Sequence, residues 1–355
     1  MSVNPALRTF FENQVRFRLV AGTEVEGGVY VGSTEFLPVE TLREDADAYQ
    51  AEFDSWLNEA WIPEQRELRS KILKLHANEK RYADLCAAVG REQVVPLVGS
   101  GMSVASGLPT WTGLLRRVRD FTTCDPNALE NLINTCQFEE AADLLASGTN
   151  PRLLAERVEH DLRIDDPNKI AGPVRLLPTV FPRLVVTTNL DNVLEHAYGS
   201  CEQWFKHVLA GGELAQYRAL KSRSLGFLLK LHGDCRRAST RVLLSGEYEA
   251  TYAAGKTIRE ELTLLYRFHN LLFLGCSLGS DRTVRLVEEV AASDDNMPKH
   301  YCFLPLPDDE ATRIGRENFL SQRGIYPIWY DLSHDESLTA LLDGLRAAAS
   351  EGTSP

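Results

Sequence analysis

The chain has 355 residues, a net charge of -12, 44% hydrophobic and 25% charged residues, which is typical of a globular protein with one large domain or two modest ones. The acidic balance argues against a nucleic-acid-binding surface, and no apolar run is long enough to span a membrane. Because the start has no apolar signal core, a cytoplasmic location is expected, and seven scattered cysteines without a C-x-x-C pair suit reduced thiols better than a zinc site.

Residues 1–91 do not show the alternation of apolar runs and helical segments found in the rest of the chain, and they are predicted to form a mainly helical extension. Alternating segments around Gly27 and Gly28 predict a hairpin, and Pro63 is expected to begin a new helix in the charged stretch that follows. Helical spacing predicts two apolar stripes, one of Leu42, Tyr49, Phe53, Trp56 and Leu57 and one of Leu68, Ile72 and Leu75. These stripes need a partner, which is either the remainder of the chain or a second subunit or partner protein.

From residue 94 onward, short apolar runs alternate with segments of helical spacing. The runs, each expected to be a buried strand, are 94–98, 183–188, 226–231, 271–275, 300–306 and 325–330. Strands separated by helices predict an α/β fold, with a Rossmann-like, mostly parallel sheet between two layers of helices, over residues 92–350. Ligands of such sheets bind outside the carboxyl ends of the strands, so the polar clusters after the runs are the candidate site.

The first run ends in the turn GSGMS at 99–103, which suits a nucleotide phosphate. Gly99 and Gly101 allow a tight turn and a close backbone approach, Ser100 and Ser103 offer hydroxyls near the next helix start, and such a turn can present N–H groups to a phosphate. The dinucleotide fingerprint G-x-G-x-x-G requires a third glycine where this chain has Val104. An ordinary strand-to-helix turn therefore stays open as the alternative, and a dehydrogenase is disfavoured.

Three further clusters follow the next runs directly, TTNLDN at 187–192, LHGDC at 231–235 and GCSLGSDR at 275–282. Together with GSGMS they resemble the sirtuin family, and within it the sirtuin-related domains of bacterial anti-phage defence proteins, over roughly residues 92–332. The zinc-binding cysteine pairs of the deacetylases are absent, and Thr110 and Thr112 stand where an aspartate and an arginine are expected. The resemblance thus implies an NAD pocket without zinc and without the usual groove for an acylated lysine.

The resemblance implies that NAD is the substrate and lies across these strand ends, with its nicotinamide ribose near Asn189 and His232. Asn189 is expected to orient water or the ribose hydroxyls, and His232 to act as general base because imidazole titrates near neutral pH. Other residues expected to contact NAD are Gly99, Ser100, Gly101, Ser103, Thr188, Asp191, Gly275, Ser277 and Asp281. The alternatives are that Asn189 orders a turn and that Asp191 and Asp281 cap helices.

Four other side chains lie near these motifs. His196 falls inside a helical segment and is interpreted as structural, and Trp111 is interpreted as part of a core. Tyr248 and Tyr252, in GEYEATYA, either form a lid over the pocket or only pack.

The first functional hypothesis is an NAD glycohydrolase that releases nicotinamide and ADP-ribose. Resemblance to the defence domains implies an effector of abortive infection through NAD depletion, a homo-oligomer, and a partner such as a HerA-type ring ATPase or a short Argonaute. Since uncontrolled loss of NAD would poison the host cell, control is required, and residues 1–91 are the first candidate for it. Two alternatives stay open: a non-catalytic sensor or scaffold that binds NAD or ADP-ribose, and an NAD-dependent protein deacylase.

Overall fold

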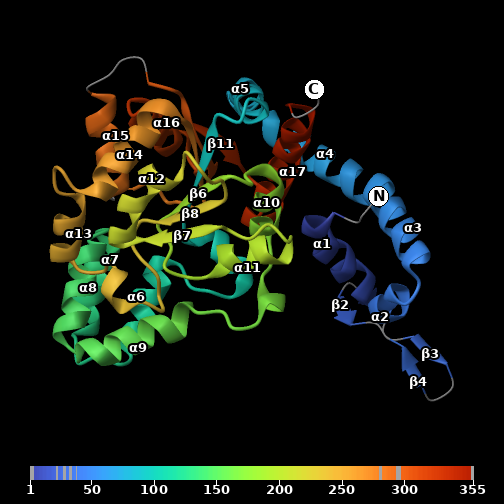
Figure 1. Cartoon of the computed structure of the whole chain (residues 1–355), viewed down its shortest axis with the longest axis horizontal. Coiled ribbons are helices and arrows are strands. Elements are labelled where there is room, and N and C mark those ends of the chain that lie inside the picture. The colour runs from blue at the N-terminus through green and yellow to red at the C-terminus, as the bar shows by residue number, and fades with distance from the viewer. Residues whose placement is uncertain are drawn as a thin grey trace.

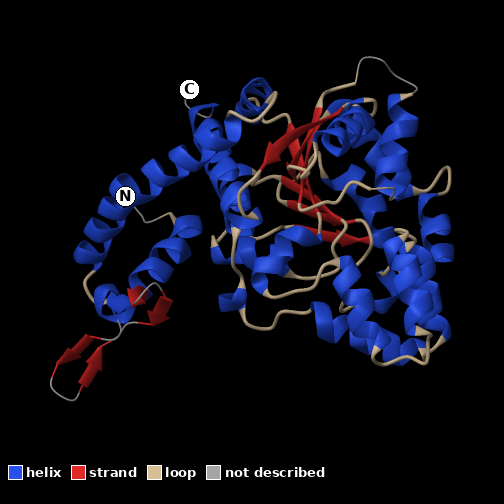
Figure 2. Ribbon diagram, turned by 180° about the vertical axis from the view of Figure 1, so that it is seen from behind, coloured by secondary structure: helices blue, strands red, loops and turns tan. Residues whose placement is uncertain are grey.

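A sheet of seven parallel strands lies at the centre of the molecule, with helices on both faces (Figure 2). The computed structural model describes residues 4–20, 23–26, 29–31, 34–36, 38–279, 282–292 and 297–352. The strands of the central sheet are β5 (Val94–Val98), β6 (Leu184–Thr187), β7 (His207–Ala210), β8 (Phe227–Lys230), β9 (Asn270–Leu274), β10 (His300–Pro305) and β11 (Ile325–Tyr330). Their order across the sheet is β11-β10-β9-β5-β6-β8-β7.

These strands confirm the predicted parallel α/β fold. The first and last apolar runs are strands with the predicted bounds, and the four runs between them differ by one residue at one or both ends. Edge strand β7 has no counterpart among the predicted strands. Its four residues, HVLA, are only half buried, so they do not form the continuous apolar run that marks the inner strands.

Alternate strand side chains point into opposite layers, and each layer has its own core. On one face, Val94 and Val98 belong to a core with α5 (Asn78–Gly90), η4 (Pro173–Leu176), α10 (Leu177–Val180), α11 (Val193–Ser200) and the C-terminal α17 (His334–Gly352). On the other face, Val95 and Leu97 belong to a core with η5 (Gly211–Gln216), α12 (Tyr217–Leu220), α14 (Thr257–Phe268), α15 (Arg282–Ala291) and α16 (Glu310–Ser321). The sheet is therefore the middle of three layers.

A further group of helices, here called the helical layer, is inserted between β5 and β6 and has a third core. It consists of α6 (Trp111–Arg119), α7 (Pro126–Asn134), α8 (Phe138–Ser147) and α9 (Pro151–Leu162), and it follows the 3₁₀ segment η2 (Ser100–Ser106). Leu190 and Cys235, which follow β6 and β8, belong to the same core. Leu243 and Leu244, just before α13 (Ser245–Tyr252), pack against it. The helical layer therefore borders the carboxyl ends of the strands. Two short 3₁₀ segments, η3 (Pro167–Lys169) and η6 (Ala238–Thr240), lie in the connecting loops.

The N-terminal segment extends from the body as an arm (Figure 1). Its helical elements are α1 (Pro5–Arg16), α2 (Pro38–Arg43), α3 (Ala46–Trp56), a π-helical stretch η1 (Leu57–Trp61) and α4 (Ile62–Leu73). Two hairpins follow α1: β1 (Phe17–Val20) pairs with β2 (Thr23–Glu26), and β3 (Val29–Val31) pairs with β4 (Thr34–Phe36). The prediction of a hairpin around Gly27 and Gly28 is wrong, because the strands on either side of them belong to separate sheets; the two glycines themselves lie outside the described residues.

The predicted apolar stripes of the arm are largely buried. Tyr49, Phe53 and Trp56 surround Phe11 of α1, and the ring centroids of Phe11 and Phe53 are 5.4 Å apart. Ile72 is fully buried in the core that α4 and α5 share with α17. Backbone angles stay helical from α3 through η1 into α4, so the new helix at Pro63 continues the one before it. The arm thus packs on the remainder of its own chain through α4, which contacts α17, and through α1, which contacts η4.

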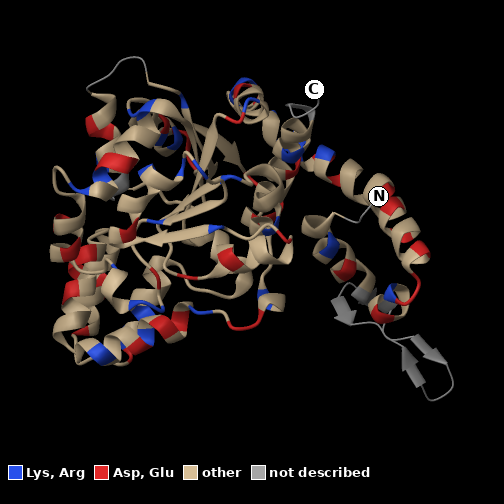
Figure 3. Ribbon diagram, in the orientation of Figure 1, with Lys and Arg blue, Asp and Glu red and all other residues tan. Residues whose placement is uncertain are grey.

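Lys, Arg, Asp and Glu are interleaved over the helices and loops (Figure 3). All seven cysteines are free thiols, and Cys201, Cys235 and Cys302 are buried. Among the helices in the described ranges, none is both long and apolar enough to cross a membrane.

Candidate active site

The four polar clusters of the sequence follow β5, β6, β8 and β9, which are consecutive neighbours in the sheet. Because these strands are parallel, their carboxyl ends lie at the same edge of the sheet. Gly99, Asn189, His232 and Gly275 are found along that edge. The chain leaves β5 for β6 on one side and returns to β9 on the other side. A reversal of this kind is where open α/β sheets bind their ligands.

Glycines at this edge allow two adjoining turns to touch through their backbones. The N–H of Gly99 donates to the carbonyl of Leu274 at 2.8 Å, and the N–H of Gly101 donates to the carbonyl of Gly275 at 3.0 Å. A Cβ atom at Gly101 would lie 2.8 Å from the Cα of Gly275, and one at Gly275, where φ is +64°, would lie 2.5 Å from the nitrogen of Met102. The close approach at these glycines is therefore between the turns after β5 and β9. A phosphate contact by this turn stays a prediction.

Ser103, Asn189 and Asp191 are buried and joined by hydrogen bonds. The Ser103 hydroxyl donates to Asp191 Oδ2 at 2.8 Å and accepts from Asn189 Nδ2 at 3.3 Å. The N–H of Asn189 donates to the Thr187 hydroxyl at 3.0 Å, which in turn donates to the carbonyl of Val98 at 2.8 Å. The side-chain amide of Asn189 thus bonds to Ser103 of η2, and its backbone is held at the end of β6.

Asp191 lies just before the helix that follows. Its Oδ1 accepts the N–H of Val193, the first residue of α11, at 3.0 Å, but the N-cap position of α11 is Asn192, one residue later than predicted. Burial raises the pKa of Asp191. The positive charge of Lys230 and the hydrogen bonds from Val193 and Ser103 lower the pKa by a smaller amount, so it is raised overall.

A buried lysine that the sequence motifs do not predict joins two loops of the site. Lys230 ends β8 and is fully buried. Its Nζ donates to the carbonyls of Leu190 at 3.3 Å and Asp191 at 2.7 Å, and to carboxylate oxygens of Glu195 and Asp234 at 3.0 Å each. Burial lowers the pKa of Lys230, but the two carboxylates outweigh it and raise the pKa overall. The lysine therefore stays charged and paired, as a buried charge must.

Asp234 completes this network on the side of His232. Burial raises its pKa, but hydrogen bonds from Arg236 and the charge of Lys230 dominate, and the pKa is lowered overall. Arg236 donates from Nη2 to Asp234 Oδ2 at 2.9 Å. The sequence signal for the network is the lysine that interrupts the apolar run GFLLKL, with an aspartate four residues later.

His232 follows β8 and packs against two tyrosines of α13. Its Nε2 lies 2.8 Å from the Tyr252 hydroxyl, and its ring meets Tyr248 edge-on with centroids 5.0 Å apart. Burial lowers the pKa of His232 to about 4, although a hydrogen bond with the Thr188 backbone opposes this. At neutral pH the imidazole is therefore uncharged and can accept a proton, but its pKa lies well below the near-neutral titration expected from the sequence, because the ring is buried, and this makes it a weaker base.

The other predicted site residues are less embedded. Ser100 begins η2 and is partly buried, and the N–H of Thr188 donates to the carbonyl at the end of β5 at 3.2 Å. The Ser277 side chain is exposed, and its carbonyl accepts a hydrogen bond from Arg316 of α16. Asp281 lies outside the described residues.

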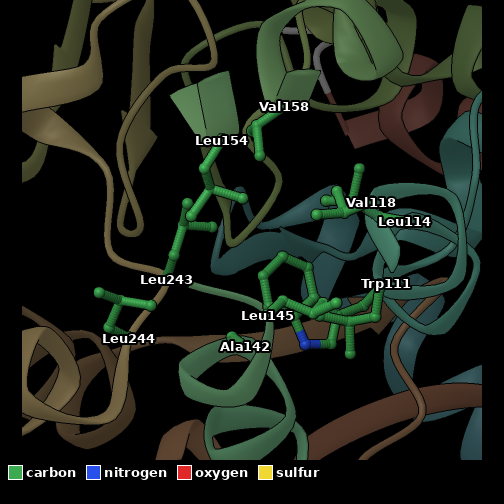
Figure 4. A pocket seen from close by; sticks show the side chains of 10 residues that line it. Trp111, Leu114, Val118, Ala142, Leu145, Leu154, Val158, Leu243 and Leu244 are labelled. Atoms are coloured by element: carbon green, nitrogen blue, oxygen red, sulfur yellow. The ribbon is translucent and has the colours of Figure 1, made fainter. Parts of the chain in front are cut away.

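His196 and Trp111 have the structural surroundings that the sequence predicted. His196 Nε2 lies 3.0 Å from the carbonyl of Ile164 and 2.9 Å from Asn192 Nδ2. Trp111 packs into the helical layer, where it lines an apolar cavity of about 20 Å³ with Leu114, Leu115, Val118, Ala142, Leu145, Leu154, Val158, Leu243 and Leu244 (Figure 4). A space of this size holds about one water molecule, so this cavity is a gap in packing and not a nucleotide site.

A second histidine lies near the glycine turn. His334 begins α17, and its Nδ1 lies 2.7 Å from the Tyr330 hydroxyl. Burial lowers its pKa, while Asp335 and the Gly101 backbone oppose the shift. The polar run DLSHDES directly after the last predicted strand is the signal that would have found it. Within the described parts of the chain, no three His, Cys, Asp or Glu side chains are grouped to hold a metal ion.

Comparison with known proteins connects this edge of the sheet to a family. Residues 183–328, which include Asn189 and His232, match the SIR2-like domain. Two curated relatives are both named NAD(+) hydrolase ThsA: one from Cytobacillus dafuensis is 23% identical over 220 residues, and one from Bacillus cereus (strain MSX-D12) is 21% identical over 222 residues. The matches cover 61% and 62% of this chain but only 42% and 45% of those proteins, so the chain spans less than half of their length. The chain contains a SIR2-like domain and is distantly homologous to these hydrolases.

Proposed function

We propose that this chain, which contains a SIR2-like domain, hydrolyses NAD to nicotinamide and ADP-ribose. The observation that supports it most is that Asn189 and His232 follow neighbouring strands, β6 and β8, at the carboxyl ends of the sheet and within the stretch that matches the SIR2-like domain. The two distant relatives support the same reaction, because each is named an NAD(+) hydrolase.

The reaction breaks the bond between C1′ of the nicotinamide ribose and the pyridinium nitrogen. The electron pair of that bond stays with the nitrogen, which makes nicotinamide neutral and leaves an oxocarbenium-like sugar. The oxygen of a water molecule then bonds to C1′, and the proton that it loses passes to a base and on to solvent. Because the leaving group is already cationic, the protein has to position the sugar, stabilise the developing charge and activate water.

In this proposal, His232 accepts a proton from a ribose hydroxyl or from the attacking water. Asn189 orients that water or the ribose hydroxyls through its side-chain amide. Ser103 and Asp191 hold that amide in place, and Asp191 also offers a carboxyl group near the nicotinamide. Lys230 has an indirect role, because it joins the loop after β6 to the loop after β8 and so holds them in position.

We further propose that NAD depletion by this protein serves anti-phage defence and is held in check until a signal or partner releases it. Residues 1–91 would form a unit for a second copy or a partner protein, and residues 92–350 the NAD-binding unit. The support for this division is that α2 and α3 extend away from the sheet, while α1 packs on η4 and α4 packs on α17 (Figure 1).

The test is nicotinamide release from NAD by the purified protein, alone and with the product of each neighbouring gene. His232→Ala and Asn189→Ala should each lower the rate strongly, by about 10²- to 10⁴-fold for the loss of a general base. His160→Ala is the matched control, because the side chain of His160 is 75% exposed on α9. Wild-type protein that binds NAD and never releases nicotinamide would favour the sensor, and release that requires an acylated peptide would favour the deacylase.

A further inference from the structure

One ring nitrogen of His232 is engaged by a tyrosine. Nε2 lies 2.8 Å from the hydroxyl of Tyr252. The Thr188 backbone raises the pKa of His232, as a carbonyl does when it accepts from a ring N–H, so we infer that the other ring nitrogen, Nδ1, carries the proton. Nε2 then carries the lone pair and accepts the proton of the Tyr252 hydroxyl. A ribose hydroxyl or a water molecule requires this same lone pair to lose its proton.

Tyr252 comes from α13, which is anchored to the helical layer and not to a strand end. The N–H of Ser245 donates to Asp143 Oδ1 of α8 at 3.1 Å, and its hydroxyl donates to Oδ2 of the same carboxylate. Leu243 and Leu244 pack into the core of the helical layer. A movement of α8 is therefore transmitted to α13 and to the tyrosine on His232.

The chain beyond Tyr252 is open. Residues 253–256 are exposed, and Gly255 has a φ of +77° with no atom within 4 Å of a Cβ position. The carbonyl of Tyr252 accepts from Arg259 Nη1 at 3.3 Å. The carbonyl at the end of α13 thus bonds to α14, the Tyr252 side chain is buried in the core around α14, and the loop that follows is exposed.

We propose that Tyr252 keeps the site closed, because its hydroxyl occupies the nitrogen on which His232 accepts a proton. Turnover requires Tyr252 to turn away from His232, and displacement of α13 by the helical layer opens the site. This inference rests on the proposed function and names its regulation.

The test compares Tyr252→Phe, which keeps the ring and removes the hydroxyl, with Tyr217→Phe, which makes the same change at a buried tyrosine of α12. Two rates are measured: nicotinamide release, and modification of His232 by diethyl pyrocarbonate followed by peptide mass spectrometry. Both rates should rise about two- to tenfold in Tyr252→Phe, the range that one neutral hydrogen bond provides, and stay at the wild-type value in Tyr217→Phe. Asp143→Ala, which releases α13 from α8, should raise both rates in the same direction.

The outcomes separate this inference from the proposed function. Faster modification of His232 together with slower nicotinamide release would overturn the closed state and make Tyr252 a participant in proton transfer. Unchanged modification in both Tyr252→Phe and Asp143→Ala would overturn it as well, whatever the rate of hydrolysis. The wild type and the variants could all fail to release nicotinamide while His232 is modified faster in Tyr252→Phe and Asp143→Ala. The contact between Tyr252 and His232 would then close the site as proposed, and the assignment as a hydrolase would fail.

Discussion

At the scale of single residues, a buried histidine links the stability of the sheet to pH. His300 is fully buried at the start of β10, and its Nδ1 accepts the N–H of Leu271 at 3.1 Å. Burial lowers the pKa of His300 to about 4, whereas a histidine of the unfolded chain titrates near 6.5. Between these two values the unfolded chain binds a proton that the folded chain does not, so the free energy of unfolding falls as the pH falls from about 6.5 to about 4.

His300→Asn should weaken this pH dependence, since the Asn oxygen can accept from Leu271 and does not titrate. Between pH 6.5 and 4.5, the wild type should lose on the order of 1–3 kcal/mol more unfolding free energy than the variant. Urea unfolding at several pH values measures both slopes, and each protein serves as its own reference at pH 7. Equal slopes for the two proteins would show that His300 is not a buried neutral group that resists protonation.

Residue types were easier to predict from the sequence than the partners of those residues. Asn189 and His232 can be predicted because they follow apolar runs and match a family pattern. Lys230 cannot, because a lysine at the end of a strand run is normally exposed, and only the fold shows that four oxygen atoms surround its Nζ. Tyr252 could be placed near the pocket, but its hydrogen bond with His232 depends on how α13 packs.

At the scale of elements, the turns after β5 and β9 depend on each other. Gly101→Ala should be destabilising by about 1–3 kcal/mol, because the new Cβ would lie 2.8 Å from the backbone of Gly275 and overpacking against backbone costs this much. Gly279→Ala is the matched control in the second turn, since no atom lies within 4 Å of its Cβ position, and its effect should stay within about 0.5 kcal/mol. Thermal and urea unfolding measure both. A Gly101→Ala protein as stable as the control would mean that the two turns can separate without cost.

Elements were predicted best where a local pattern is strong. The inner strands could be predicted because they are continuous apolar runs, and β11 keeps its predicted bounds even though Pro327 lies in it, at the edge of the sheet. The hairpin in the arm was misplaced because Gly27-Gly28 looks like a turn, while the pairs β1-β2 and β3-β4 form on either side of it. The helical layer has helical spacing, but nothing local in it indicates that it borders the strand ends through Leu190 and Cys235.

At the scale of the whole molecule, α17 connects the arm to the candidate site. In its middle, Asp343 is buried and accepts from Trp61 Nε1 at 3.0 Å and from Arg346 Nη2 at 2.7 Å, and it pairs with Arg69 at 3.8 Å. At its start, His334 lies near the glycine turn, and the Gly101 backbone opposes the lowering of its pKa. One helix therefore contacts the arm, through Trp61 and Arg69, and begins near the glycine turn.

Asp343→Asn tests whether this connection reaches the site. Loss of the charge weakens the hydrogen bonds and ion pairs to Trp61, Arg69 and Arg346, at a cost of about 1–3 kcal/mol, so amide hydrogen exchange over residues 46–73 should accelerate. If α17 carries the effect to His334, the KM for NAD should also rise about two- to fivefold, the equivalent of roughly 0.5–1 kcal/mol in binding. Asp331→Asn, an exposed position just before α17, should change neither quantity. Faster exchange in the arm with an unchanged KM would mean that the arm is docked on α17 without being coupled to the strand ends. Control of the site by the arm would then require a partner that contacts both the arm and the strand ends.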